Sequence, residues 1–413
     1  GAPMDLFEKC HQDQLVNEAK KAIAAGIYPY FIALEEHEGT VATYQGRKVI
    51  MCGSNNYLGL TMDPRVRDAS RQALEHYGPS CTGSRFLNGN LTMHEQLERE
   101  LAAFFGKQAA LVFSTGYQTN LGAISALVGR NDIALVDKDD HASIVDGCRL
   151  SFGELKRFAH NDMADLERQL RAAPARAGKL VIVDGVYSMG GDIASLPDIV
   201  RLCQQHGTRL LVDDAHGAGI LGGGHGTAAH FGLTDQVDLI MTTFSKSFAS
   251  LGGAIMGDED VIRYIKHHAR SLIYSASIPP ANAAAALASL RIMRDEAQHS
   301  TRVMAIGAYM RRSLTALGYD IGESQTPIVP IITGGIEPTL ALWRTLLDAG
   351  VFTNPVLPPA AATGRLRTSY MATHTEEQIN HVLEIFAWAG RRLGIIPPVP
   401  PVEPVPMKLA LGF

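Results

Sequence analysis

The stretch that decides the fold reads Leu239-Ile-Met-Thr-Thr-Phe-Ser-Lys-Ser-Phe-Ala-Ser-Leu-Gly-Gly253. An apolar run that changes into Thr, Ser and Gly is typical of a buried strand that leaves a sheet into a tight loop. Lys246 then stands at the carboxyl end of a strand, where α/β folds usually place their chemistry. A lysine amine that is shielded from water can form a Schiff base, and the hydroxyls of Thr243 and Ser245 could hold a phosphate. Together these groups suggest pyridoxal phosphate (PLP), although such a lysine taken alone is more often a surface residue.

The flanking sequence alternates strand-like and helical segments. Strand-like runs lie at 109–113, 133–137, 179–183, 209–213, 239–243 and 253–256, and helical patterns lie at 118–128, 162–171 and 196–206. This alternation predicts an α/β fold with a mostly parallel central sheet and helices on both faces. Polar or reactive side chains follow the strands, so we expect the functional site at the carboxyl edge of the sheet.

The chain of 413 residues is too long for one simple core, and its patterning predicts four parts. They are an N-terminal helix and hairpin segment (1–52), a large PLP-binding catalytic domain (53–285), a smaller C-terminal α/β domain (286–396) and a Pro-rich tail (397–413). The helical spacing of the first part covers residues 5–25. The tail has polyproline II composition, for which we expect an extended arm.

The composition excludes several classes of protein. Hydrophobic residues make up 46% and charged residues 19%, as in folded globular proteins. The net charge of −5 gives no basic footprint for nucleic acid and no polybasic membrane signal, and no apolar run approaches the roughly 20 residues that span a bilayer. Five cysteines without CxxC spacing favour a reducing cytoplasm over disulfides or a zinc site, so no metal is expected. Contact with a membrane surface is left open, and residues 1–4 are interpreted as a processing remnant before a native Met4, not a signal peptide.

The ring of PLP needs two kinds of partner. A carboxylate at the pyridine nitrogen keeps the ring protonated and makes it a better electron sink; Asp213 is the candidate and Asp214 the competitor. His141 follows another strand and could stack on the ring, and His216 could reach the ring hydroxyl or move a proton. Plainer interpretations exist, because aspartate often caps a helix and a histidine beside acids is often only hydrogen-bonded.

The phosphate of PLP and the carboxylate of an amino acid need partners as well. The segment 114–120, Ser-Thr-Gly-Tyr-Gln-Thr-Asn, lies between a strand and a helix, where backbone N–H groups and the helix dipole bind phosphate. Arg367 could bind the carboxylate through a planar, bidentate pair. Arg365 lies two residues away on the same face of a strand-like run, so the pattern does not choose between them. The loop 78–89 is too rich in Gly, Ser and Asn for a plain connector and is a candidate substrate loop.

Ordered motifs along nearly the whole chain carry a resemblance. They are Asn55-Asn-Tyr-Leu-Gly-Leu60, Thr82-Gly-Ser-Arg-Phe-Leu-Asn-Gly89, Phe113-Ser-Thr-Gly-Tyr117, Asp140-His-Ala-Ser-Ile-Val-Asp-Gly147, Asp184-Gly-Val-Tyr-Ser-Met189, Val212-Asp-Asp-Ala-His216, Thr243-Phe-Ser-Lys-Ser247 and Tyr274-Ser-Ala-Ser-Ile-Pro-Pro280. From about Asp5 to about Pro397 the chain resembles the α-oxoamine synthases, which are PLP enzymes of fold type I, with an aspartate aminotransferase-like architecture.

The resemblance implies catalytic roles for individual residues. Lys246 would hold PLP as a Schiff base and move the α-proton of the substrate. His141 would stack on the ring, and Asp213 would pair with its nitrogen. Ser188 and His216 would approach the phenolic oxygen of the ring.

The resemblance also implies binding roles. Residues around the phosphate would be Gly116, Tyr117, Thr243 and Ser245. Ser275 would reach the phosphate of the neighbouring subunit, which implies a homodimer with shared active sites. Arg367 would bind the amino-acid carboxylate, and Asn56 would lie near the substrate.

The reaction that the resemblance implies is a decarboxylative condensation of a small L-amino acid with an acyl thioester, which gives an α-amino ketone, CO2 and a free thiol. Ser84 aligns where the glycine-using branch of the family carries threonine. The smaller side chain leaves room for a substrate side chain, which favours serine or alanine over glycine. The resemblance further implies L-serine with palmitoyl-CoA as acyl donor and 3-ketosphinganine as product. The alternatives are alanine or glycine with another acyl-CoA or a carrier-protein-bound acyl group, a PLP aminotransferase or lyase, and an inactive partner subunit.

Overall fold

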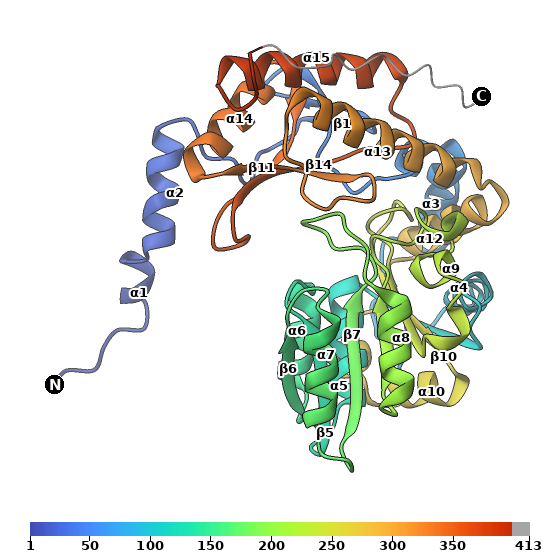
Figure 1. Cartoon of the computed structure of the whole chain (residues 1–413). Helices are drawn as coiled ribbons and strands as arrows, with labels where there is room; N and C mark the ends of the chain where they lie inside the picture. Colours follow the sequence, from blue (N-terminus) through green and yellow to red (C-terminus); the bar gives the residue numbers. More distant parts are fainter. Residues whose placement is uncertain (399–413) are drawn as a thin grey trace.

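The computed structural model describes residues 1–398 and contains two lobes (Figure 1). The centre of the larger lobe is a seven-stranded sheet in the order β4-β10-β9-β8-β7-β5-β6. Its strands are β4 (Ala109–Phe113), β5 (Asp132–Asp137), β6 (Glu154–Phe158), β7 (Gly178–Asp184), β8 (Arg209–Asp213), β9 (Leu239–Thr243) and β10 (Gly253–Gly257). Neighbours from β9 to β6 pair in parallel, and β10 runs antiparallel to both β4 and β9. The predicted α/β fold with a mostly parallel sheet is confirmed.

Helices cover both faces of this sheet because the side chains of each strand alternate between two apolar cores. In β7, for example, Val181 and Val183 belong to one core, and Leu180 and Ile182 belong to the other. The first core includes α4 (Thr92–Phe104), α7 (Met163–Ala172), α8 (Leu196–Gln205) and α12 (Pro280–Asp295), and the second includes α5 (Gly116–Leu127), α6 (Ala142–Leu150) and α10 (Glu259–His268). The other elements of this lobe and its borders are η1 (Leu60–Met62), α3 (Pro64–Tyr77), η2 (Gly222–Gly224), α9 (Thr227–His230), η3 (Thr234–Gln236) and α11 (Arg270–Ile273).

The smaller lobe has its own apolar core. It contains a three-stranded sheet of β11 (Ile328–Gly334), β14 (Gly364–Ser369) and β13 (Asn354–Val356), with helices α13 (Gln298–Leu317), α14 (Ile336–Asp348) and α15 (Glu376–Arg392). A second sheet joins the N-terminal strands β1 (Glu36–Glu38), β2 (Val41–Tyr44) and β3 (Arg47–Met51) to β12 (Val351–Phe352), which pairs in parallel with β3. The N-terminal hairpin therefore shares the core of the C-terminal region.

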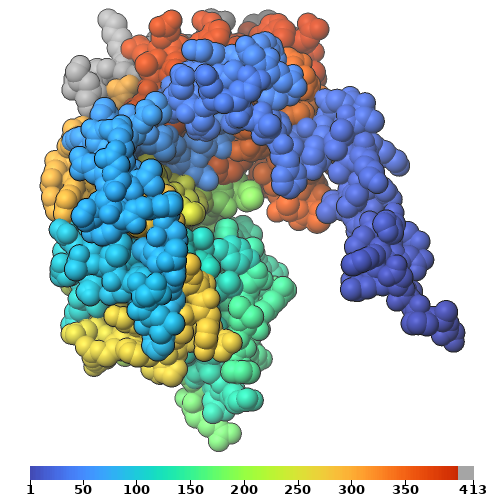
Figure 2. Space-filling model, turned by 180° about the vertical axis from the view of Figure 1, so that it is seen from behind, coloured from blue at the N-terminus to red at the C-terminus, as the bar shows by residue number. Residues whose placement is uncertain are grey.

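The first residues form an arm that leaves the body of the molecule (Figure 1), and Figure 2 shows it standing clear of both lobes. The helical pattern predicted over 5–25 is divided into α1 (Glu8–His11) and α2 (Gln14–Ala24), because Asp13 caps a new helix start by accepting from the N–H of Val16. Neither helix has a buried residue. Within the described residues no helix is both long and apolar enough to cross a membrane. The Pro-rich tail predicted from 397 lies outside the described residues from position 399 onward.

Candidate active site

A cavity of about 250 Å³ lies at the carboxyl edge of the large sheet. Its lining comes from the segments that follow β4, β5, β7, β8 and β9, as the strand pattern predicts for a mostly parallel sheet. The predicted site residues that line it are Gly116, Tyr117, His141, Ser188, Asp213, His216, Thr243, Ser245 and Lys246. Sequence segments more than 100 residues apart thus converge on one space.

Lys246 lies in the loop between β9 and β10, with its side chain largely shielded from water. This loop is closed at its base, where the Thr243 hydroxyl donates to the carbonyl of Gly252 at 3.1 Å. Burial lowers the pKa of the Lys246 ammonium below its usual value, Asp213 opposes this effect, and Arg367 adds to it. A larger fraction of the amine is therefore uncharged and nucleophilic than for a lysine in water.

Asp213 ends β8 and is held by two donors. Asn120 Nδ2 donates to its Oδ2 at 2.9 Å, and the N–H of Ala215 donates to its Oδ1 at 3.0 Å. Asp214 does not line the cavity; its carboxylate accepts from the N–H and hydroxyl of Thr227, at 2.7 and 2.6 Å. The two neighbouring carboxylates thus point to different surroundings, and of the two only Asp213 belongs to the site.

A chain of hydrogen bonds links Asp213 to His141. Asn120 Nδ2 also donates to the hydroxyl of Ser143 at 2.9 Å, and that hydroxyl lies 2.7 Å from His141 Nδ1. The N–H of Ser143 donates to the same ring nitrogen at 3.1 Å, so Nδ1 acts as the acceptor and the proton of a neutral ring lies on Nε2. His141 is exposed and stands edge-on to Tyr117, with the ring centroids 6.0 Å apart.

The start of α5 forms a cradle beside Lys246. Thr115 caps the helix by accepting from the N–H of Gln118, and the first backbone N–H groups of the helix have no partner within it. A Cβ on Gly116 would lie 2.7 Å from Thr243 Oγ1, so only glycine leaves this approach open. Thr243 and Ser245 bring their hydroxyls to within 2.9 Å of each other here. Tyr117 is exposed and donates its hydroxyl proton to Asp146.

Arg367 reaches the site from β14 in the smaller lobe. Its Nε donates to the carbonyl of Ser188 at 2.7 Å, and its Nη2 donates to Asn55 Oδ1 at 2.9 Å and to the Tyr57 hydroxyl at 3.1 Å. Arg365 lies on the same face of the strand, as predicted, and donates to the carbonyl of Met189 at 3.3 Å. The guanidinium of Arg367 is buried, whereas Arg365 is only half-buried.

His216 lines the cavity, is buried, and pairs with Tyr57, whose hydroxyl lies 2.7 Å from His216 Nδ1. The tyrosine oxygen already accepts from Arg367, so its proton is available to the imidazole. Burial and the nearby cations Lys246 and Arg367 hold the pKa of His216 well below its usual value. The imidazole is therefore neutral, with Nδ1 as acceptor.

Four predicted residues do not line the cavity of this chain: Arg367, which reaches it only through Ser188, and Asn56, Ser84 and Ser275. Asn56 is buried and donates to Thr61 Oγ1 at 2.8 Å. Ser84 pairs with Ala276 in an isolated bridge, and Ser275 accepts from Gln118 Nε2 at 3.2 Å, close to the start of α5. Their predicted roles toward substrate and toward a neighbouring subunit stay predictions.

Sequence reasoning missed Asp184, Asn120 and Tyr57 as site residues. Asp184 lines the cavity, accepts from the N–H of His141 at 3.0 Å, and has a raised pKa because of burial and the nearby Asp213 and Asp140. It ends an apolar run just as Asp213 does, which is the signal that could have identified it. Asn120 and Tyr57 lie within motifs that the sequence singles out, but their partners come from distant segments.

The groups that line the cavity are those that PLP needs from a protein. One shielded amine, one buried carboxylate, a helix start with free N–H groups, and a cradle that a single Cβ would fill meet in one cavity.

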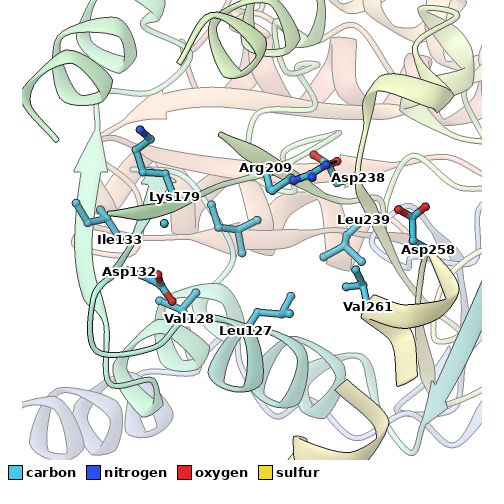
Figure 3. Close-up of a pocket in the computed structure, with 12 residues that line it drawn as sticks. Leu127, Val128, Asp132, Ile133, Lys179, Arg209, Asp238, Leu239, Asp258 and Val261 are labelled. Atoms are coloured by element: carbon cyan, nitrogen blue, oxygen red, sulfur yellow. Dashed lines mark hydrogen bonds and ion pairs between the residues drawn. The ribbon is translucent and has the colours of Figure 1, made fainter. Parts of the chain in front are cut away.

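A second pocket of about 310 Å³ lies at the opposite edge of the sheet (Figure 3). It is lined by the amino-end residues of β5, β7, β8 and β9, such as Ile133, Lys179 and Leu239, and includes the ion pair Arg209–Asp238 at 2.8 Å. None of the predicted site residues lines it. Chemistry in α/β folds belongs to the carboxyl edge, so the cavity around Lys246 is the candidate active site.

Comparison with known proteins gives similarities over nearly the whole chain. The family model for aminotransferase class I and II matches residues 47–386. Serine palmitoyltransferases of Sphingobacterium spiritivorum and Bacteroides thetaiotaomicron are 47% and 48% identical over 382 and 380 residues, which cover 92% and 91% of this chain and 95% and 96% of theirs. A putative 8-amino-7-oxononanoate synthase 2 of Mycobacterium tuberculosis is 42% identical and covers 93% of this chain and 50% of that protein.

Solved structures give the same result. A serine palmitoyltransferase from S. paucimobilis, described with a bound PLP–myriocin aldimine, matches with a TM-score of 0.92 and 38% identity. The Sphingomonas wittichii serine palmitoyltransferase matches with a TM-score of 0.92 and 40% identity. Each similarity covers 95% of this chain and 100% of the other.

Proposed function

The chain belongs to the aminotransferase class I and II family, and we propose that it is a PLP-dependent α-oxoamine synthase that resembles serine palmitoyltransferase in its reaction. It would join L-serine to palmitoyl-CoA and release 3-ketosphinganine, CO2 and coenzyme A. The observation that carries this proposal is the single cavity that holds Lys246, Asp213 and His141 beside the guanidinium of Arg367.

Bound PLP would supply an electron sink for the α-carbon of the amino acid. Lys246 would hold it covalently and would take and return the α-proton at Nζ. The lowered pKa of Lys246 favours the free amine that both tasks need. Asp213 would pair with the ring nitrogen, and Asn120 fixes this carboxylate by donating to its Oδ2.

Arg367 would bind the carboxylate of the amino acid. Its Nε and Nη2 are occupied, whereas Nη1 makes no hydrogen bond to any described residue. His141 would lie over the ring, and Ser188 and His216 would face its phenolic oxygen. Holding the amino acid between these groups would set the α-C–H bond in the direction that Lys246 can reach.

In the overall reaction one C–C bond forms between the α-carbon of serine and the acyl carbon of the thioester. The C–S bond of the thioester breaks and the thiol leaves, and the carboxylate of serine leaves as CO2. The similarity to a putative 8-amino-7-oxononanoate synthase makes the same condensation with another amino acid and acyl donor the second candidate.

We further propose that the active unit is a homodimer. Ser275 lies outside the cavity of its own chain and would serve the phosphate of the neighbouring subunit, whereas Asn56 and Ser84 would lie near the substrate. The N-terminal arm, which Figure 2 shows standing clear of both lobes, supports this proposal because it carries exposed apolar side chains. They include Leu6, Phe7, Leu15 and Ile23.

The first test of the function is a titration of the visible spectrum of the PLP-loaded protein with L-serine, L-alanine and glycine. We expect a saturable change with serine at lower concentration than with the other two. A saturable change with alanine or glycine alone would move the assignment to the second candidate. A protein that binds no PLP would contradict both.

A further inference from the structure

A group of aspartates surrounds the active-site edge of the sheet. Its members are Asp137, Asp139, Asp140, Asp184, Asp192 and Asp213, and all except Asp139 are buried. Burying so many carboxylates close together is unfavourable unless cations or protons compensate them. Lys246 and Arg367 are the cations near the carboxylates that face the cavity. His160 is the cation near Asp137 and Asp192.

His160 lies in the loop between β6 and α7 and joins two of these carboxylates directly. Its Nδ1 lies 2.8 Å from Asp137 Oδ1, and its Nε2 lies 2.6 Å from Asp192 Oδ2. Asp139 approaches Nδ1 to 3.4 Å, and the ring of Tyr187 packs edge-on at 4.4 Å. The imidazole is therefore flanked by acidic groups from the end of β5 and from the loops that follow β5 and β7.

Both ring nitrogens face carboxylate oxygens, which accept hydrogen bonds. A neutral imidazole has one N–H and one acceptor nitrogen, and the acceptor would repel one carboxylate. Only the imidazolium donates on both sides. Burial lowers the pKa of His160, but the hydrogen bonds and charges of Asp137 and Asp192 outweigh this and raise it to about 10.

Asp137 is connected by hydrogen bonds to His141, the residue proposed to stack on the ring. The N–H of Asp137 donates to Asp140 Oδ2 at 3.0 Å, and Asp140 Oδ1 accepts from the N–H of Asp184 at 3.0 Å. Asp184 in turn accepts from the N–H of His141. A displacement of Asp137 would therefore move the backbone that sets His141 against the cavity.

Asp192 belongs to the loop that holds Arg367, the residue proposed to bind the substrate carboxylate. Asp192 lies in the loop after β7, whose Ser188 carbonyl accepts from Arg367 and whose Met189 carbonyl accepts from Arg365. The same loop contacts the smaller lobe, since Thr326 donates to the carbonyl of Gly191 at 2.8 Å. His160 thus fixes the segment between the two lobes on which Arg367 rests.

We propose that His160 is a positioning residue that, as an imidazolium, ties the segment carrying His141 to the loop carrying Ser188, and so fixes the cofactor and substrate-carboxylate contacts. This inference rests on the proposed function, because it assigns His160 to a PLP site. It predicts that the positive charge at position 160, more than the ring itself, maintains the site.

The test compares His160→Gln with His160→Lys in the PLP-loaded protein. The amide of His160→Gln can donate to only one carboxylate, so we expect about tenfold weaker retention of PLP and about tenfold weaker serine binding. His160→Lys keeps a cation that can reach both carboxylates and should restore both constants to within about threefold of the original protein. Retention is measured by the loss of PLP absorbance on dialysis, and serine binding by spectral titration.

His299→Gln is the matched control. His299 pairs with Glu296 at 3.1 Å, and its side chain is 25% exposed, against 28% for His160. It does not line the cavity. We expect this variant to leave both constants unchanged. If His160→Gln behaves like the control, or if His160→Lys is as impaired as His160→Gln, the proposal is wrong.

An NMR titration of 13C-labelled histidine checks the protonation state without relying on the reaction. The signal that is lost in His160→Gln should not titrate between pH 6 and 9. Titration of this signal near the ordinary histidine pKa would overturn the proposal. A fall in thermal stability on EDTA treatment would also overturn it, because a metal ion, and not a proton on His160, would then hold Asp137, Asp139 and His160 together. If the original protein binds no PLP, the proposed function fails, and this titration still decides the state of His160.

Discussion

Asp213 and Asp214 are neighbours in the chain, but their surroundings assign them different tasks. Asp213 faces the cavity and is held by Asn120 and Ala215. Asp214 holds the start of α9 through Thr227, and burial raises its pKa to about 6. Isosteric replacement of each carboxylate separates the two tasks.

For Asp213→Asn we expect kcat/KM to fall at least about 100-fold, because a neutral amide cannot stabilise a protonated ring nitrogen, while Tm changes little. For Asp214→Asn we expect the reverse: Tm falls because an amide NH2 now faces the donors of Thr227, and kcat/KM stays within about threefold. Steady-state kinetics and calorimetry of both variants give the comparison. Loss of activity in Asp214→Asn with none in Asp213→Asn would show that the two residues were assigned the wrong way round.

Local sequence could identify residues whose chemistry is visible in their own segment. Lys246 stands between two serines after an apolar run, and Gly116 stands at a strand-to-helix turn; both line the cavity. The tasks of Asn120 and His160 depend on partners far away in sequence, at Asp213 and Asp192. No local pattern records such pairs, so these residues were not predicted.

At the scale of elements, the start of α5 is the proposed phosphate site. For Gly116→Ala we expect PLP affinity to fall about tenfold or more, since the new Cβ would lie 2.7 Å from Thr243 Oγ1 and narrow the cradle. The measurement is a PLP titration of the apo-protein.

Gly335→Ala is the control for this prediction. Gly335 likewise stands at the start of a helix, as the residue before α14, but the nearest neighbour of a new Cβ there is Pro338 at 3.4 Å, an ordinary contact. We expect PLP affinity to be unchanged in this variant. Equal losses in both variants would mean that the effect comes from general destabilisation and not from the cradle.

The strands that were predicted are the ones with continuous apolar runs, because they are buried on both faces of the sheet. β6 (Glu154–Phe158) was missed. It is an edge strand with charged residues at Glu154, Lys156 and Arg157, and only Phe158 is buried. At the edge of the sheet the side chains of β6 are mostly exposed and can be charged. Its sequence therefore lacks the apolar run that predicts a strand.

At the scale of the whole molecule, the parallel arrangement brings five loops to one edge of the sheet and explains why the site could be placed before its contacts were known. The position of the N-terminal hairpin could not be predicted in the same way. It joins the core of the smaller lobe through β12, some 300 residues further along the chain, which local periodicity does not record.

The proposed homodimer makes a prediction at this scale. Lys246→Ala and Ser275→Asp should each be nearly inactive, the first for lack of the amine and the second because a carboxylate would repel the phosphate. If Ser275 serves the neighbouring site, a mixed dimer of the two variants has one intact site. After subunit exchange, an equimolar mixture should recover up to about a quarter of the original activity.

The control for this experiment is each variant mixed with itself, which should stay inactive. Exchange is verified by mass spectrometry of tagged subunits. If exchange occurs and activity does not return, then Ser275 acts within its own subunit or not at all.

The measurement that tests the central claim most directly is product analysis with L-serine and palmitoyl-CoA. The PLP-loaded protein should form 3-ketosphinganine, free coenzyme A and CO2 in equal amounts, and the Lys246→Ala variant should reduce all three together by roughly three orders of magnitude or more. Equal yields tie the new C–C bond to the loss of the thiol and the carboxylate. Formation of a keto acid or an elimination product without thiol release, or unchanged turnover in Lys246→Ala, would contradict the account.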